Sequence, residues 1–207
     1  KLYHQNGKLN QIHLYKNDQL QKVHIFYESG SSKEISNWEN GKKQGEYKLY
    51  HENGKLKAIG SLKDDKKYGD WKTYHENGKL WNFSSWNNGI QDGNKKVYNQ
   101  NGKLEEISTY KNGKAEGEYK VYHKNGKLKA IGSLKHGKLE GESKSYHEDG
   151  TLNEVGSFKN DKREGEWKTY HENGKLEGIG SYKDGKWEGE WKYYYENGKL
   201  WEIGSYK

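Results

Sequence analysis

The 207-residue sequence contains no cysteine, no methionine and no long apolar run. The absence of cysteine excludes a disulfide framework, a thiolate metal site and a thiol nucleophile. No stretch approaches the roughly 20 apolar residues of a membrane-spanning helix. The chain opens at Lys1 in the middle of a repeated motif and shows no signal-like segment, although a leader removed from the N-terminus would leave no trace in this sequence.

Aliphatic residues are also scarce. Hydrophobic residues make up 29% of the chain, against about 45–50% in ordinary globular domains when glycine is included. Such a composition could indicate disorder, but 18 Tyr and 8 Trp stand at fixed phases of a repeat, as a disordered chain would not keep them. The sequence therefore predicts an ordered but thin structure without a thick core.

Charge of one sign is not segregated anywhere in the chain. The net charge of +7 arises from 37 basic and 30 acidic residues that alternate at short range, as in Glu164-Gly165-Glu166-Trp167-Lys168. Nucleic-acid-binding proteins usually gather basic residues on one face or tail. We therefore interpret the charge as solvated strand faces and expect no nucleic-acid partner.

What the sequence does contain is a repeat of 24 residues. Two glycine series keep this step, and the second extends back to Gly30 and, one residue short, to Gly7. A fixed period in this range indicates an array of small supersecondary units. We predict about nine units in a single array over residues 1–207, the first truncated. The series are Gly45, Gly69, Gly93, Gly117, Gly141, Gly165, Gly189 and Gly54, Gly78, Gly102, Gly126, Gly150, Gly174, Gly198.

Each unit reads as a β-hairpin. A run rich in Trp, Thr and Tyr meets Asn77-Gly78 and a second run follows, which is the strongest short-range hairpin signal. A tyrosine lies four residues before the turn glycine and a leucine two residues after it. A three-residue loop with a glycine bulge places this pair, Tyr74 and Leu80, directly opposite each other. A second turn, such as 63–66, leads to the next unit.

The fold class predicted is all-β: an elongated, open antiparallel meander of about 16 to 18 strands, largely single-layered. Strict alternation of side chains divides each sheet into two faces. One stripe is then Tyr50, Leu56, Ala58, Gly60 and Leu62, which we interpret as the structural spine. The other stripe is Tyr47, Leu49, His51 and Ile59, which we interpret as a variable surface.

The repeated motifs resemble MORN repeats, specifically the bacterial variant found in the YwqK antitoxin-like group. The residues that carry the resemblance are Gly-Glu-Trp-Lys-Thr-Tyr-His-Glu-Asn-Gly-Lys-Leu at 165–176 and Gly-Ser-Tyr-Lys-Asp-Gly-Lys-Trp-Glu-Gly at 180–189. The resemblance implies a hairpin array that serves as an interaction module, with no catalytic residue to carry over. It implies a bacterial protein, which leaves its localisation open between the cytoplasm and the periplasm or cell surface.

Neither metal binding nor catalysis is expected. Equivalent histidines in successive hairpins lie about 10 Å apart, so they cannot share one ion. Carboxylate pairs such as Glu140 and Glu142 recur in unit after unit beside lysines, whereas a catalytic centre is normally singular. We expect no enzyme activity, no cofactor and no metal. The histidines of this phase are His4, His51, His75, His123, His147 and His171.

The remaining hypothesis is binding. Tyr, Trp and mixed charge are typical of protein interfaces, and the resemblance implies a toxin that the protein neutralises as an antitoxin or immunity protein. The alternative is an exported envelope protein that binds glycans or surface proteins through its aromatic stripe. We predict partner contacts at tryptophans outside the spine, namely Trp71, Trp81, Trp167, Trp187, Trp191 and Trp201.

Overall fold

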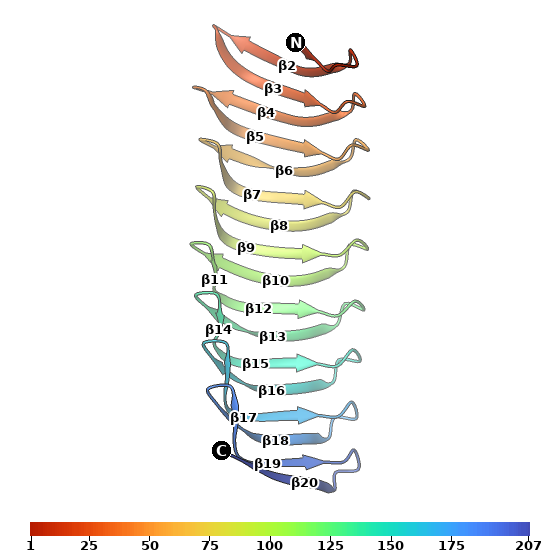
Figure 1. The fold of residues 1–207 in the computed structure, drawn as a ribbon, viewed down its shortest axis with the longest axis vertical. Coiled ribbons are helices and arrows are strands. Elements are labelled where there is room, and N and C mark those ends of the chain that lie inside the picture. The colour runs from red at the N-terminus through yellow and green to blue at the C-terminus, as the bar shows by residue number, and fades with distance from the viewer. The chain divides into compact units, whose positions relative to one another are not determined.

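The computed structural model describes residues 1–207 and contains twenty β-strands and no helix. The chain divides into two units, Lys1–Lys103 and Leu104–Lys207. In each unit the strands form an antiparallel meander, and Figure 1 shows successive hairpins following one another in chain order. The all-β fold of repeated hairpins predicted from the sequence is confirmed. The structure contains no helix that could span a membrane.

The first unit contains nine strands, each paired with its neighbours in the chain. They are β1 (Leu2–Tyr3), β2 (Leu9–Lys16), β3 (Gln19–Phe26), β4 (Ser32–Glu39), β5 (Lys42–Tyr50), β6 (Leu56–Lys63), β7 (Lys66–Tyr74), β8 (Leu80–Asn87) and β9 (Ile90–Tyr98).

The second unit contains eleven strands, because two strands are interrupted just before a repeat glycine and so are counted twice. They are β10 (Leu104–Lys111), β11 (Lys114–Ala115), β12 (Gly117–Tyr122), β13 (Leu128–Lys135), β14 (Lys138–Leu139), β15 (Gly141–Tyr146), β16 (Leu152–Lys159), β17 (Lys162–Tyr170), β18 (Leu176–Lys183), β19 (Lys186–Tyr194) and β20 (Leu200–Tyr206).

The Asn-Gly loop has the predicted geometry, and the second turn lies where the sequence predicts it. In the loop after β7, the His75 N–H donates to the Lys79 carbonyl and the Gly78 N–H donates to the His75 carbonyl. Gly78 has φ of 90°. This is the three-residue loop with a glycine bulge, and Tyr74 lies opposite Leu80 as predicted. The turn between β6 and β7 has two residues with positive φ, Asp64 at 50° and Asp65 at 66°, which matches the twist of the strands.

The two glycine positions of the strands serve different purposes. Gly69 has φ of 69° and open space where a Cβ would lie. Glycine is therefore favoured there by the left-handed backbone conformation and not by a lack of space. Gly69 lies in a bulge, where Ile59 pairs with Lys72 but Ser61 pairs with Tyr68. Gly60 instead provides room, because a Cβ there would lie 2.4 Å from the Trp71 ring.

The prediction of which residues share a face was wrong. Ala58 and Leu62 are buried in one cluster with Trp71, against which Tyr47 and Leu49 pack. Strict alternation fails because of a β-bulge: Leu49 pairs with Ala58, but the next residue, Tyr50, pairs with Leu56. The extra residue shifts the alternation. The core therefore combines Ala58 and Leu62 of the stripe interpreted as the spine with Tyr47 and Leu49 of the stripe interpreted as a variable surface. We call this face, with Tyr47, Leu49, Ala58, Leu62, Trp71 and their equivalents, the aromatic face.

The opposite face of the sheet, which we call the charged face, carries Glu46, Lys48 and their equivalents. Lys48 forms an ion pair with Glu46 at 2.7 Å, and the hydrogen bond to that carboxylate raises the pKa of Lys48. Exposed pairs of this kind contribute little to stability. They keep the face solvated, as the mixed charge of the sequence predicts. The same pair recurs as Glu118–Lys120, Glu142–Lys144, Glu166–Lys168 and Glu190–Lys192.

Candidate functional site: an aromatic groove in the first unit

The polar residues of the Asn-Gly loops tie each hairpin to the next. His51 Nε2 donates to the Tyr74 carbonyl at 3.0 Å, Asn53 Nδ2 to the Glu76 carbonyl at 3.0 Å, and Lys55 Nζ to the Asn77 carbonyl at 2.9 Å. Three hydrogen bonds from one loop thus reach backbone acceptors of the following loop. The motif His-Glu-Asn-Gly-Lys therefore forms the turn and also connects each hairpin to the next by hydrogen bonds.

The histidine phase has a structural role that was not predicted from the sequence. All six of these rings contact a backbone carbonyl in the next hairpin through Nε2, so each ring donates its proton there. Tyr27 occupies the same phase and donates its hydroxyl to the Tyr50 carbonyl at 2.8 Å. The sequence contained a signal for this role: one position of the repeat holds either histidine or tyrosine, and both side chains can donate a hydrogen bond from the ring to a distant acceptor.

The six predicted contact tryptophans fall into two groups. Trp71, Trp167 and Trp191 are buried, with 4%, 2% and 4% of their surface exposed. Each lies over a glycine of the preceding strand and donates its Nε1–H to a backbone carbonyl. These three have a packing role. The other three are exposed: Trp81 at 51%, Trp187 at 41% and Trp201 at 59%.

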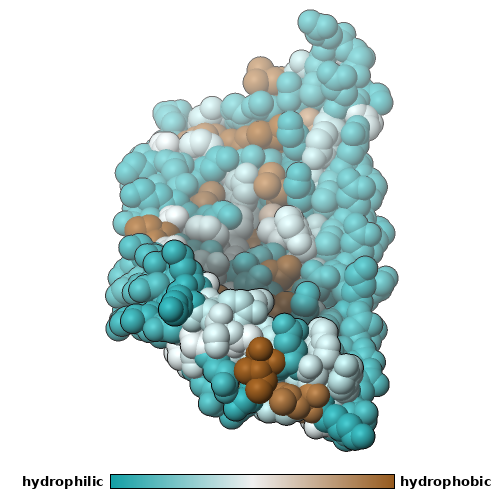
Figure 2. All heavy atoms as spheres, turned by 60° about the horizontal axis from the view of Figure 1, so that its bottom comes forward, coloured by the Kyte–Doolittle hydropathy of each residue, from teal (hydrophilic) through white to brown (hydrophobic).

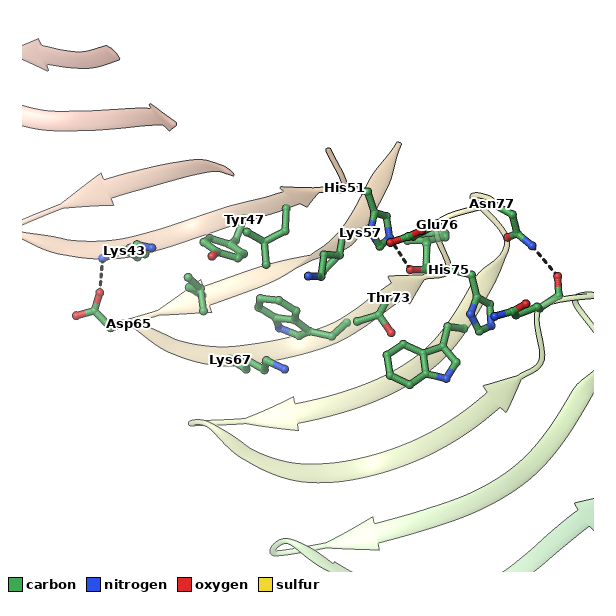
Figure 3. Close-up of a pocket in the computed structure, with 17 residues that line it drawn as sticks. Lys43, Tyr47, His51, Lys57, Asp65, Lys67, Thr73, His75, Glu76 and Asn77 are labelled. Carbon is green, nitrogen blue, oxygen red and sulfur yellow. Dashed lines mark hydrogen bonds between the residues drawn. The ribbon is translucent and has the colours of Figure 1, made fainter. Parts of the chain in front are cut away.

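A groove of about 1040 Å³ lies on the aromatic face of the first unit. The buried side chains of Ala58, Leu62 and Trp71 line it, and Figure 3 shows Tyr47 and Thr73 on the same face. Figure 2 shows hydrophobic residues in brown and residues of intermediate hydropathy in white in the middle of one face, with hydrophilic residues in teal along its sides.

The two ends of this groove differ in chemistry. At the end near the Asn-Gly loops it is lined by His51, His75 and the exposed ring of Trp81, which lies 5.8 Å from the His75 ring. At the other end Lys43 and Lys67 enter it (Figure 3). The groove therefore combines flat rings with cationic donors, and rings of this kind are suited to anchoring another molecule.

The two lysines of the groove are in different electrostatic states. Lys43 Nζ lies 2.5 Å from Glu34 Oε1, and Tyr47 donates its hydroxyl to the other carboxylate oxygen at 3.0 Å. Burial and the Glu34 charge together raise the pKa of Tyr47. Lys67 has no such carboxylate: its ammonium lies over the rings of Trp71 and Trp86, 4.7 and 4.4 Å from their centroids. Burial lowers the pKa of Lys67.

On the aromatic face of strands β16–β19, in the second unit, aromatic rings pack against one another instead. Trp167 meets Phe158 and Tyr182 edge-on, with centroids 5.1 and 5.9 Å apart, and Tyr182 meets Trp191 in the same way at 5.1 Å. Arg163 lies 4.2 Å above the Trp167 ring. A hollow of about 810 Å³ near the end of this unit is lined by Tyr193, Tyr195 and Trp201, among others.

Comparison with known proteins identifies the repeat. A family model described as "MORN repeat variant" matches eight segments that together cover more than half of the chain: 1–17, 43–64, 67–88, 91–112, 115–136, 139–160, 163–184 and 187–207. The spacing of the matches follows the 24-residue period, and hairpin β3–β4 lies between the first two. The comparison with curated proteins gave no match.

Among solved structures, similar chains come from crystal structures titled TcdB2-TccC3-TEV, TcdB2-TccC3-Cdc42 and TcdB2-TccC3 without hypervariable C-terminal region. Their sequence identities are 14%, 11% and 11%, and their TM-scores are 0.22, 0.21 and 0.20. The matches cover 90%, 99% and 100% of this chain but span only 11%, 16% and 15% of those chains. Scores this low carry no conclusion about this protein.

Proposed function

The chain belongs to the MORN repeat variant family, and we propose that it is a non-enzymatic scaffold that binds a protein partner on its aromatic face. The observation that carries the proposal is the groove of the first unit, where exposed and half-buried rings stand beside a lysine without a carboxylate partner. Interfaces are anchored by such buried or half-buried aromatic groups, surrounded by polar residues.

The rigidity of the scaffold supports the proposal. Each Asn-Gly loop that holds the groove is fixed to the next by hydrogen bonds such as those of His51, Asn53 and Lys55. A preformed surface loses little conformational entropy when a partner binds. The repeat thus provides a stiff frame, while the side chains at the face differ from unit to unit and can specify the partner.

For the identity of the partner we propose a toxin that the protein neutralises in the manner of an antitoxin or immunity protein. The support is the resemblance of 165–176 and 180–189 to the bacterial YwqK antitoxin-like group. An inhibitor of this kind needs a complementary surface and no catalytic group, and we propose the groove as that surface.

The alternative is a glycan partner. Its support is the exposed ring of Trp81 beside His75, and the exposed ring of Trp201 with Tyr195 at 6.0 Å. Flat exposed rings can stack on sugar rings. For a toxin and for a glycan alike, we propose that the partner contacts the exposed tryptophans.

A capture experiment tests the proposal. The immobilised protein is incubated with a lysate of cells that express the candidate toxin, and retained proteins are identified by mass spectrometry. We expect Trp81→Ala to reduce retention about tenfold or more. The matched control is Tyr68→Ala in the neighbouring strand β7. It removes a ring that is 47% exposed but lies on the charged face, paired with Ser61, which in turn pairs with Glu46.

Two results would contradict the proposal. Equal retention by Trp81→Ala and wild type would show that the partner does not bind the aromatic face at Trp81. If no protein is retained while a soluble polysaccharide shifts the tryptophan fluorescence, and Trp81→Ala abolishes that shift, the toxin hypothesis fails and the glycan alternative replaces it.

A further inference from the structure

Two hairpins of the aromatic face place an acid and a base in the same relation. Across β4–β5, Lys43 Nζ lies 2.5 Å from Glu34, and across β16–β17, Arg163 Nη2 lies 2.7 Å from Glu154. In both hairpins the glutamate precedes the cation by nine residues. The repeat therefore contains a position for a carboxylate at which it neutralises the cation of the neighbouring strand.

The hairpin β6–β7 has the cation but not the acid. Lys67 stands where Lys43 and Arg163 stand, and the position of Glu34 and Glu154 is taken by Ala58. The Lys67 ammonium has only the faces of Trp71 and Trp86 as partners. A partly desolvated ammonium without a carboxylate is costly.

A second polar group beside Ala58 also lacks a partner. Thr73 pairs directly with Ala58 across β6–β7, and its hydroxyl oxygen is buried without a hydrogen bond. In the hairpin of the second unit, Thr169 pairs in the same way with Glu154. An unsatisfied buried hydroxyl is rare in folded proteins. Ala58 is thus flanked by an ammonium without a carboxylate and a hydroxyl without a hydrogen bond, and both Lys67 and Thr73 line the groove.

We infer that this position receives a carboxylate from outside: an Asp or Glu side chain from an acidic segment of a protein partner enters the groove and binds Lys67 and Thr73. The inference rests on the proposed function and specifies the chemistry of the partner. The Ala58 methyl group leaves room for the incoming group. The walls, Leu62 and Trp71, are apolar and suit the methylene groups of a glutamate.

Other groups of the groove do not fill this role. The Asp65 carboxylate accepts the backbone N–H of Lys43 at 2.8 Å, and Glu76 is exposed in the Asn-Gly loop. The choice of a carboxylate over a phosphate follows from the repeat itself, because Glu34 and Glu154 fill the equivalent positions and because a single cation matches a single negative charge.

The test uses a short synthetic glutamate peptide as probe and isothermal titration calorimetry as readout, with a glutamine peptide and inorganic phosphate in parallel. We expect the glutamate peptide alone to bind. Lys67→Gln should weaken this binding about tenfold or more. Ala58→Glu should weaken it as strongly, because the new side chain pairs with Lys67 as Glu154 pairs with Arg163. The Tm of each variant shows that it is folded.

The matched control is Lys72→Gln, an exposed lysine of the same strand on the opposite face, which should change the affinity less than about twofold. Equal weakening by Lys72→Gln and Lys67→Gln would overturn the inference, since it would indicate unspecific attraction to a cationic chain. Binding of the glutamine peptide with equal affinity, no binding of the glutamate peptide, or equal competition by phosphate would also overturn it.

The same variants separate this inference from the proposed function. If the captured protein is lost with Trp81→Ala but retained by Lys67→Gln and Ala58→Glu, the scaffold binds a protein and only the carboxylate inference fails. If all three variants lose the protein while Lys72→Gln retains it, both stand. If no protein is captured but the glutamate peptide binds through Lys67, the chemistry of the site stands and the proposed protein partner fails.

Discussion

The two units place different side chains at equivalent positions of one repeat. In the second unit Glu154, Phe158, Arg163, Trp167 and Tyr182 form a continuous set of edge-on rings around a neutralised cation. In the first unit the equivalents are Ala58, Leu62, Lys67, Trp71 and Trp86, and here the groove lies beside a lysine without a carboxylate. Strands β6–β7 and β16–β17 pair in the same register, so the difference at these positions of the aromatic face comes from the size and charge of the side chains.

The loops show a second contrast. The loop 51–55 sends three hydrogen bonds to the next hairpin, from His51, Asn53 and Lys55. The loop 147–151 sends only the bond from His147, because Asp149 has no donor and the Thr151 hydroxyl donates to Asp149 within the same loop. The stiffness of the scaffold is thus distributed unevenly along the chain.

The largest effect is expected from the packing tryptophans. Trp167→Ala removes a ring that is 2% exposed and contacts two other aromatic side chains, so it should lower the free energy of unfolding by about 3–5 kcal/mol. Urea denaturation measures this. Trp81→Ala, which removes an exposed ring, should change it by less than about 0.5 kcal/mol. Similar losses in the two variants would contradict the division into packing and exposed tryptophans.

A smaller effect is expected where glycine lies under a ring. A Cβ at Gly156 would lie 2.1 Å from the Trp167 ring, so Gly156→Ala should cost about 1–3 kcal/mol. In a double-mutant cycle, the same change in a Trp167→Ala background should cost much less, because the ring that it displaces is gone. Equal costs in both backgrounds would indicate that the glycine is needed for its backbone and not for space.

The loop contrast predicts an effect of about 1 kcal/mol. His51→Ala and His147→Ala each remove one hydrogen bond between hairpins. The loss at His147 should be the larger, since its loop has no second or third bond to the next hairpin. Thermal unfolding of the two variants measures the difference. A larger loss for His51→Ala would show that the bonds of one loop act cooperatively rather than as substitutes for one another.

The smallest effect is expected in the pH dependence of thermal stability. Asp149 accepts hydrogen bonds from the hydroxyl and the N–H of Thr151, which lower the pKa of its carboxyl. A carboxyl with a folded pKa below its unfolded value stabilises the fold above that unfolded value, and the contribution disappears as pH falls through the folded pKa. The Tm advantage of wild type over Thr151→Val should therefore be present at neutral pH and fade in acid. An advantage that is constant with pH would exclude this cause.

Much of the fold could be predicted from the sequence because it is encoded locally. Asn77-Gly78 and the pair Tyr74–Leu80 specify the loop and its register without knowledge of any distant contact. The assignment of faces could not be predicted from strict alternation, because the bulge at Leu49 and Tyr50 adds one residue. The first glycine series indicates only a period, whereas the structure uses Gly69 for a left-handed backbone bulge.

The site was predicted only in part. The tryptophans could be named from the sequence. The buried Trp71 could not be distinguished from the exposed Trp81, because a β-bulge between them breaks the alternation that would assign each ring to a face. Lys67 was not predicted at all. The signal was nevertheless present: aligning the repeats places Ala58 where Glu34 and Glu154 stand, while the cation nine residues later is kept. Lys67 thus lacks the carboxylate that Glu34 and Glu154 provide for Lys43 and Arg163.

The measurement that tests the binding site most directly is the NMR spectrum of the tryptophan indole N–H groups during titration with the glutamate peptide. The chain has 8 tryptophans, and single Trp→Phe variants assign their signals. We expect the indoles of Trp71 and Trp86, which flank Lys67, to shift first, while those of Trp167 and Trp191 stay in place. Shifts confined to Trp167 and Trp191, or equal shifts in all indoles, would contradict the assignment of the binding site to the open face of the first unit.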